Sequence, residues 1–141
     1  EGGIPEQAVR AVDGRLTREL RRVGYTAKVL KKVGFPLYEI VQGDYSAADL
    51  KEAKYNATEL KEVGFSAGSL RVAGFTSRQL DAAKYKLREM QEGGYPWKDL
   101  VIFLRATYTE LTDAGYKKLD PKHRLFLEYR HEPDLEVGVV Q

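Results

Sequence analysis

The sequence contains no cysteine, which excludes disulfide bonds, cysteine-ligated metal sites and thiol catalysis. Long apolar runs are also missing: the longest, residues 100–104, is far shorter than the roughly 18 residues that a membrane-spanning helix needs. An excess of one charge is missing too, because 23 Lys or Arg residues stand against 21 Asp or Glu residues and the formal net charge is +2. This balance gives no general electrostatic reason to expect a polyanionic partner.

The sequence does contain enough apolar residues to build a core. Of its 141 residues, 43% are hydrophobic and 31% are charged, and these fractions favour a folded protein over a disordered or collagen-like one. The chain begins with Glu1 rather than Met, so a preceding targeting segment is left open. Composition therefore leaves the compartment undetermined.

A ten-residue repeat runs through most of the chain. One column of large aliphatic residues and one column of aromatic residues recur at interval ten in the same register. The aliphatic column is Leu20, Leu30, Ile40, Leu50, Leu60, Leu70, Leu80, Met90 and Leu100, and the aromatic column is Tyr25, Phe35, Tyr45, Tyr55, Phe65, Phe75, Tyr85 and Tyr95. Each decapeptide is therefore predicted to be one structural unit.

The other positions of the decapeptide predict a short helix. Numbered from the residue before the aromatic, position three suits an N-cap, as Ser46 and Asn56 show, and an acid three residues later, Asp49 or Glu59, completes a capping box. Position one is often Gly, which suits the left-handed residue that follows a helix. Helices of two turns are unstable alone in water, so neighbouring units must stack. The expected fold is all-α, a solenoid of short two-turn helices that repeat every ten residues.

Some units depart from this pattern. Position one is Asp44, Lys54 or Lys84 in three units, and we expect those turns to be looser or differently shaped. Lys86 stands at an N-cap position that its side chain cannot cap.

A right-handed β-solenoid of pentapeptide type is the main alternative fold, because a large apolar residue recurs every five positions. The residue two places before the Leu is often long and charged, as Arg18 and Lys28 are, and does not fit inside a narrow coil. Pro36 and Pro96 also suit the start of a helix better than an interior strand. The helical interpretation is therefore favoured.

The units resemble decapeptide repeats of the type Ala/Val-Gly-Phe/Tyr-Ser/Thr-x-x-Glu/Asp-Leu-Lys, which occur in multicopy arrays in many algal, protist and viral proteins. The resemblance covers about residues 20–119 and is closest over residues 44–74. It implies a helical interaction array, and the family carries no assigned catalytic residues.

The repeat divides the chain into three regions. Residues 1–23 are predicted to form N-terminal capping helices, residues 24–119 the decapeptide-repeat α-solenoid, and residues 120–141 a C-terminal tail without the repeat. The register breaks near residues 101–107, where the leucine spacing grows to eleven and Ala106 replaces the aromatic residue. We expect a longer helix, a kink or a change of superhelical path there. The tail is expected either to fold back over the last helix or to lie on another protein.

The sequence offers no set of residues typical of catalysis. His123 and His131 lie in the tail near carboxylates, but no metal-ligand spacing such as HExxH is present. Nucleophile–base and phosphate-loop motifs are missing as well. We therefore expect a protein that is not an enzyme and that needs no cofactor or metal.

We expect instead a scaffold, linker or adaptor subunit that makes protein–protein contacts in a multisubunit complex. Because aromatic and aliphatic anchors dominate protein interfaces, apolar residues outside the buried columns are the candidate contacts. They are Tyr38, Val41, Val72, Trp97, Ile102, Phe103, Tyr108, Phe126 and Tyr129. The resemblance to algal repeats suggests peripheral association with an organellar membrane complex, such as a light-harvesting assembly in a plastid.

A nucleic-acid-binding helical repeat array is the alternative function. A basic cluster beside tyrosines supports it, namely Arg10, Arg15, Arg18, Arg21 and Arg22. Against it, residues 24–103 hold twelve basic and ten acidic residues, and helix-end electrostatics already explain the basic column. The variable positions five and nine are expected to face outward and to carry any specificity.

Overall fold

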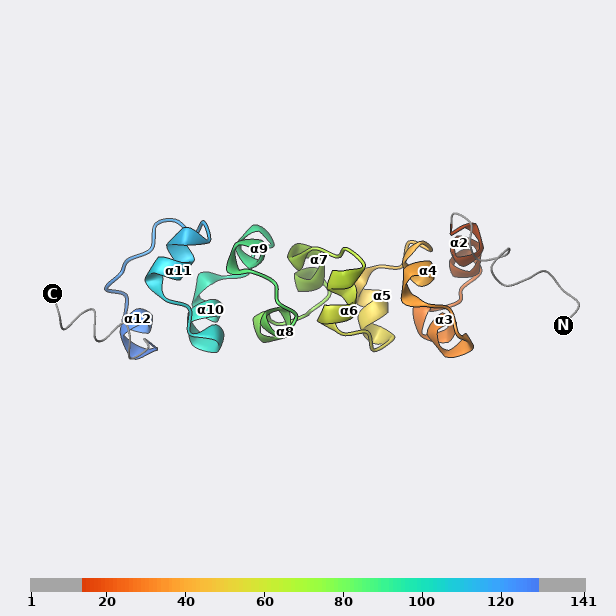
Figure 1. Ribbon diagram of the computed structural model, residues 1–141, viewed down its shortest axis with the longest axis horizontal. Helices are drawn as coiled ribbons and strands as arrows, with labels where there is room; N and C mark the ends of the chain where they lie inside the picture. Colours follow the sequence, from red (N-terminus) through yellow and green to blue (C-terminus); the bar gives the residue numbers. More distant parts are fainter. Residues whose placement is uncertain (1–13, 130–141) are drawn as a thin grey trace, which may run out of the picture. The chain divides into compact units, whose positions relative to one another are not determined.

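The computed structural model describes residues 14–129 and is all-helical there, with no β-strand among these residues (Figure 1). The chain divides into two compact units, Glu1–Phe65 and Ser66–Gln141. The first unit contains α2 (Arg15–Arg22), α3 (Ala27–Val33), α4 (Leu37–Val41), α5 (Ala47–Glu52) and α6 (Ala57–Glu62). The second contains α7 (Ala67–Val72), α8 (Ser77–Ala82), α9 (Leu87–Glu92), α10 (Trp97–Leu104), α11 (Tyr108–Asp113) and α12 (Arg124–Glu128).

These short helices, spaced about ten residues apart, confirm the predicted repeat solenoid. The helix predicted before Gly14 and the closing valines of the tail lie outside the described residues. The helices of residues 14–129 have at most eight residues each, so none of them can reach across a lipid bilayer.

The helices begin at the predicted N-caps. In α5 the N–H of Asp49 donates to Oγ of Ser46 at 3.1 Å, and the N–H of Ser46 donates to Oδ2 of Asp49 at 2.9 Å. The same reciprocal box opens α6, α8 and α11. Lys86 before α9 makes no side-chain cap, as predicted, although its N–H donates to Oε2 of Glu89 at 2.6 Å. Local hydrogen-bond chemistry therefore sets where these capped helices start.

Glycine and lysine adopt the same left-handed backbone conformation in the turns that follow these helices. The glycines after α2, α3, α6, α7, α9 and α11 have φ between 90° and 107°, and Lys54 and Lys84 have φ of 70° in the same place. The N–H of Tyr55 donates to the carbonyl of Leu50 at 3.1 Å across the Lys54 turn, as Phe65 does to Leu60 at 3.0 Å across a glycine turn. The expectation of looser turns is therefore wrong at Lys54 and Lys84, because lysine tolerates the left-handed region at a cost of about 1 kcal/mol.

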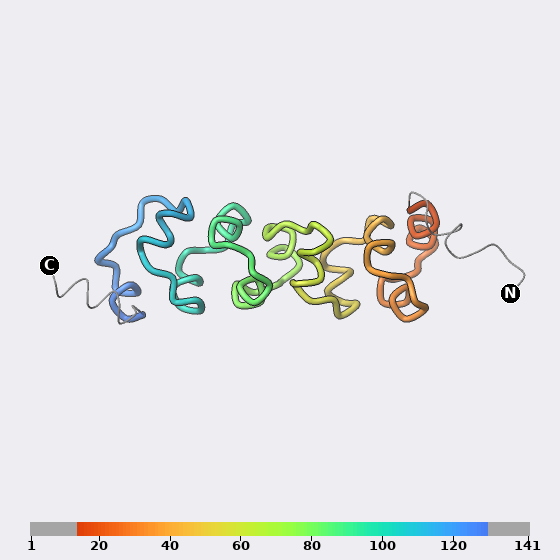
Figure 2. The backbone as a smooth tube through the Cα atoms, in the orientation of Figure 1, coloured from red at the N-terminus to blue at the C-terminus, as the bar shows by residue number. Residues whose placement is uncertain are grey.

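Within each unit, a helix packs against the helix two places along the chain. In the first unit α3 packs on α5, and in the second α7 packs on α9, α8 on α10, α9 on α11 and α10 on α12. These contacts form two rows of helices in the second unit, α7, α9 and α11 in one row and α8, α10 and α12 in the other. Figure 2 shows the backbone of the second unit alternating between them. The aliphatic column is fully buried between the helices from Leu30 to Leu100. The structural period is thus twenty residues, twice the sequence period.

Tyrosine hydroxyls join turns that are twenty residues apart. Oη of Tyr45 donates to the carbonyl of Tyr25 at 2.6 Å, and Oη of Tyr95 donates to the carbonyl of Phe75 at 2.7 Å. Tyr116 donates in the same way to the carbonyl of Tyr95. The aromatic column therefore contributes hydrogen bonds as well as apolar area.

Some basic side chains bind the carbonyl end of a helix two places along. Nζ of Lys31 donates to the carbonyl of Ala53 at 3.1 Å and lies 4.2 Å from the ring centre of Tyr55. In the second unit a guanidinium nitrogen of Arg88 donates to the carbonyl of Asp113 at 2.5 Å. The last carbonyls of a helix lack an intrahelical partner, so these bases stabilise the stack.

Candidate functional site

Helices α10, α11 and α12 carry most of the predicted contact residues. The residues concerned are Trp97, Ile102 and Phe103 on α10, Tyr108 on α11, Phe126 on α12 and Tyr129 directly after it. The second unit thus brings residues from either side of the register break onto three helices that pack together.

The register break changes the local structure in two ways. Helix α10 has eight residues, whereas α9 and α11 have six. The chain then turns through Arg105, whose φ is 60°, and the N–H of Ala106 donates to the carbonyl of Leu100 at 3.1 Å. As at the aromatic residues elsewhere, this N–H donates to the carbonyl of the column leucine, but the turn holds one residue more and the ring is missing.

Rings from three segments pack together beside this turn. The rings of Trp97 and Phe126 stack with centroids 5.3 Å apart, and Tyr108 meets Phe126 edge-on at 5.7 Å. Phe126 is only 7% exposed, so its prediction as an exposed contact residue is corrected: α12 folds back onto α10 and encloses this ring. Residues 124–128 therefore fold back onto the repeat helices, which is the first of the two alternatives expected for the tail.

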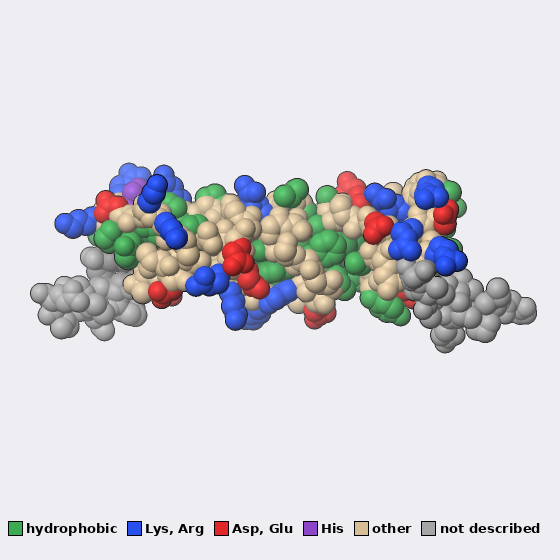
Figure 3. All heavy atoms as spheres, turned by 90° about the horizontal axis from the view of Figure 1, so that it is seen from above, with side chains coloured by type: hydrophobic (Ala, Val, Ile, Leu, Met, Phe, Trp, Pro, Cys, Tyr) green, Lys and Arg blue, Asp and Glu red, His purple; other side chains and the backbone are tan. Residues whose placement is uncertain are grey.

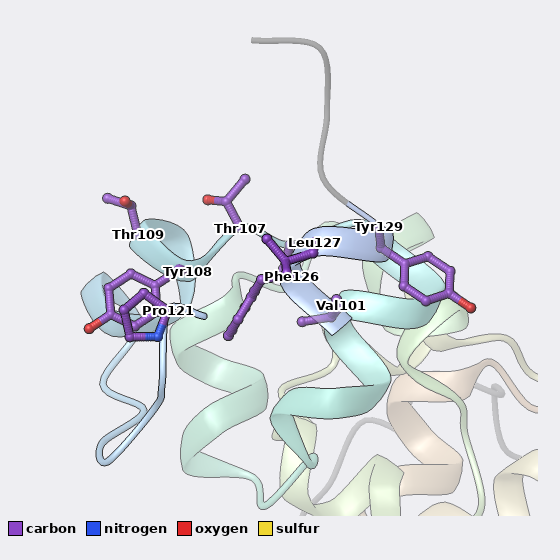
Figure 4. Close-up of a pocket in the computed structure, with 9 residues that line it drawn as sticks. Val101, Thr107, Tyr108, Thr109, Pro121, Phe126, Leu127 and Tyr129 are labelled. Carbon is purple, nitrogen blue, oxygen red and sulfur yellow. The ribbon is translucent and has the colours of Figure 1, made fainter. Parts of the chain in front are cut away.

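A hollow of about 190 Å³ lies beside these rings (Figure 4). Its lining, which we call the α10–α12 hollow, consists of Val101, Ala106, Thr107, Tyr108, Thr109, Pro121, Phe126, Leu127 and Tyr129. In Figure 4 Phe126 extends from α12 into the space between Tyr108 and Val101. Because Ala106 lines the hollow, an aromatic residue at that position would occupy part of it. The hollow thus coincides with a unit that lacks its aromatic residue, as the unit of α2 also does with Arg15 in that position.

The surroundings of the hollow combine exposed apolar side chains with cations. Leu127 in the lining is 55% exposed. The guanidinium of Arg105 lies 4.6 Å from the ring centre of Tyr129, and that of Arg78 lies 5.1 Å from the ring centre of Phe103. Exposed apolar surface of this kind is common at protein contacts.

The other predicted contact residues lie elsewhere. Tyr38 is exposed and Val41 half-buried on α4 in the first unit, and Val72 is exposed on α7. None of these three lines the α10–α12 hollow.

Sequence reasoning missed several lining residues. Val101, Pro121 and Leu127 line the hollow but were not predicted to do so. The signals that point to them are the inserted residue in the leucine spacing, the missing ring at Ala106, and apolar residues of the tail that have no repeat partner.

His123 has a structural role in this region. Its Nδ1 accepts a hydrogen bond from the N–H of Leu125 at 3.2 Å at the start of α12, and its ring meets Trp97 edge-on at 5.1 Å. His131 lies outside the described residues. Among residues 14–129, no group of three or more His, Asp or Glu side chains could hold a metal ion.

Comparisons with known proteins bear on the repeat itself. The family described as decapeptide repeat region matches residues 14–87 and again residues 56–123, and the two matches together cover more than half of the chain. No curated protein and no solved structure matches the chain. Because the family match spans the helices from α2 to α11, with their shared caps and turns, the chain belongs to the decapeptide repeat family.

Proposed function

We propose that this chain is a non-enzymatic scaffold or adaptor that binds a partner protein at the α10–α12 hollow. The observation that carries the proposal is the hollow itself, which lies where Ala106 replaces the aromatic residue of the repeat. Leu127 and Tyr129 at this site are accessible to a partner.

The size of the hollow favours a protein anchor over a small molecule. Sites for small ligands and cofactors usually measure about 300–1,000 Å³, whereas this hollow measures about 190 Å³. That volume suits one or two apolar side chains of a partner. Burying such an anchor typically contributes about 1.5–3 kcal/mol, and a few anchors of this kind dominate most protein interfaces.

The broader setting that we propose is a subunit of a larger assembly, such as an organellar membrane complex of the light-harvesting type. The occurrence of similar repeats in algal proteins supports this part of the proposal. The partner would then be another subunit of that assembly, with the repeat stack as the rigid support of the site.

The experiment is affinity purification of the tagged chain from its source, with the bound proteins quantified by mass spectrometry. Two variants address the hollow: Leu127→Asp places a charge in its lining, and Ala106→Tyr supplies the ring that other units have. The matched control is Thr58→Asp, because Thr58 is exposed on α6 and the substitution adds the same charge.

The wild type and Thr58→Asp should retain a stoichiometric partner, and each hollow variant should retain about tenfold less, the loss of one good anchor. Equal recovery by all four proteins would refute the site. Recovery of no partner by the wild type would refute the adaptor function.

A further inference from the structure

The near-neutral total charge includes a strongly basic segment in the first unit. Residues 14–34, which contain α2 and α3, hold seven Lys or Arg residues and a single acidic residue, Glu19. All seven bases are exposed. Figure 3 shows Lys and Arg side chains gathered over this part of the molecule, towards the right.

Several of these cations have partners within the unit. Arg22 pairs with Glu19 at 3.2 Å. Lys31 donates to a carbonyl, and Arg21 lies 5.9 Å from the ring centre of Tyr45. A carbonyl or a ring stabilises a cation without cancelling its charge, so the surface keeps a positive potential.

Apolar side chains are exposed in the same place. Val23 and Val33 are each 67% exposed, and Val29 is exposed one turn before Val33 on α3. Lys28 and Lys32 are likewise one turn apart, so two valines and two lysines run side by side along α3. Residues 15–33 on these two helices, with their exposed bases and valines, are called the α2–α3 surface below.

A groove of about 790 Å³ borders the α2–α3 surface. Its lining includes Arg21, Tyr25, Lys28 and Tyr45, together with the carboxylates of Asp49 and Glu52. Tyr25 is 50% exposed there, whereas Tyr45 in the same aromatic column is 5% exposed. The groove thus leaves an aromatic side chain of the repeat uncovered.

The segment of residues 130–141 has the complementary composition. It holds three acidic residues against one arginine, and four aliphatic residues, Leu135, Val137, Val139 and Val140. Twelve residues can span up to about 40 Å when extended, whereas a helix as short as α3 is about 10 Å long. The segment is therefore long enough to cover α3 and to enter the groove.

We propose that residues 130–141 of one copy of this chain dock on the α2–α3 surface of a second copy. The carboxylates meet the lysines and arginines, and the aliphatic side chains cover Val29 and Val33. The two contacting surfaces differ, so the interface is heterologous and each copy offers one donor segment and one acceptor surface.

Two other anionic partners fit the observations less well. Nucleic acid would engage the bases through its phosphates but would leave the valines exposed. An anionic lipid surface is broad, whereas the groove beside the bases admits a narrow extended chain.

The test is sedimentation velocity of the purified full chain from about 1 to 500 μM, which brackets the affinity expected for a short segment. The surface variant is Val29→Asp with Val33→Asp, and the segment variant is Leu135→Asp with Val137→Asp. The matched control is Thr58→Asp with Ala82→Asp, two exposed positions that receive the same charge change.

The wild type and the control should form assemblies that grow with concentration and weaken as salt is raised. Each variant alone should associate about tenfold more weakly. An equimolar mixture of the two variants should form a dimer and stop there, because it retains one intact donor and one intact acceptor.

Three results would overturn the proposal. They are a wild type that stays monomeric throughout, a surface variant that assembles like the wild type, and a mixture that fails to dimerise. Flotation of a monomeric wild type with phosphatidylglycerol vesicles, or its retention on RNA, would assign the surface to a lipid or a nucleic acid instead. The readout uses the purified chain alone, so failure here leaves the adaptor function untouched.

Discussion

Lys54 shows how a single residue is stabilised by the repeat around it. Its φ is 70° where Gly64 has 96°, and both turns carry the same pair of hydrogen bonds: the N–H of Lys54 donates to Lys51 at 2.9 Å, and the N–H of Gly64 donates to Lys61 at 3.0 Å. The neighbouring helices therefore impose the left-handed conformation on a residue that does not favour it.

Lys54→Gly should raise the free energy of unfolding by about 0.5–1 kcal/mol, because glycine has no Cβ penalty at positive φ. Urea denaturation followed by circular dichroism measures the change. The control is Thr58→Gly in the exposed interior of α6, which should lower the stability by about 0.5–1 kcal/mol. A loss of stability with both substitutions would contradict the interpretation of the turn.

The buried tyrosines make the stability sensitive to alkaline pH. Burial raises the pKa of Tyr95 to about 12 against the opposing effect of Arg71, and burial together with Asp99 raises the pKa of Tyr116 to about 12. The unfolded chain releases these protons near the ordinary pKa of 10.0. The contribution of these tyrosines to the free energy of unfolding is therefore fully present below about pH 10 and should be lost as the pH rises from about 10 to 12.

Absorbance at 295 nm during an alkaline titration, with unfolding followed in parallel, measures this effect. Tyr95 and Tyr116 should ionise together with unfolding, because burial raises their pKa in the folded chain. Ionisation of all the tyrosines in one step without loss of helix would show that the hydroxyls are not buried.

At the scale of the element, helix α9 is the one described repeat helix with a lysine at its N-cap. Glu89 already accepts from the N–H of Lys86, so only the side-chain half of a capping box is missing. Lys86→Ser should supply it and raise the stability by about 0.5–1 kcal/mol.

The reverse substitution at α5, Ser46→Lys, removes an existing cap and should cost about 1 kcal/mol. Thermal melts of the two single variants give both values. A neutral effect at both positions would mean that stacking, rather than capping, sets the stability of these helices.

Most helix starts and stops could be predicted from the sequence because they depend on residue type. The hydroxyl or amide of Ser46 or Asn56 reaches its own helix, and glycine accepts positive φ wherever it stands. The bond from Tyr95 to Phe75 could not be predicted, because it depends on which helices become neighbours in space. The same reason applies to Lys31, whose partner carbonyl at Ala53 lies two helices away.

The candidate site was predictable in part for a similar reason. The unusual spacing near Ala106 and the aromatic residues on either side of it are visible in the sequence. The burial of Phe126 and the accessibility of Leu127 are not, since they follow from how α12 packs on α10.

At the scale of the whole molecule, the structural repeat contains two sequence repeats. The decapeptides share one pattern of caps and buried aliphatic residues, so the sequence does not distinguish alternate helices. Packing distinguishes them, since α3 rests on α5 in the first unit and, in the second, α7, α8, α9 and α10 each rest on the helix two places along. A near-neutral total charge likewise conceals the basic α2–α3 surface, because net charge sums over regions that act separately.

The central functional claim is that the decapeptide stack supports a partner-binding site at the α10–α12 hollow. Hydrogen exchange measured by mass spectrometry on the free chain and on its purified complex tests this claim most directly. Peptides covering residues 101–109 and 124–129 should exchange more slowly in the complex, while those covering α5 and α6 should be unchanged. Slower exchange confined to α5 and α6, with residues 101–109 unaffected, would contradict the claim.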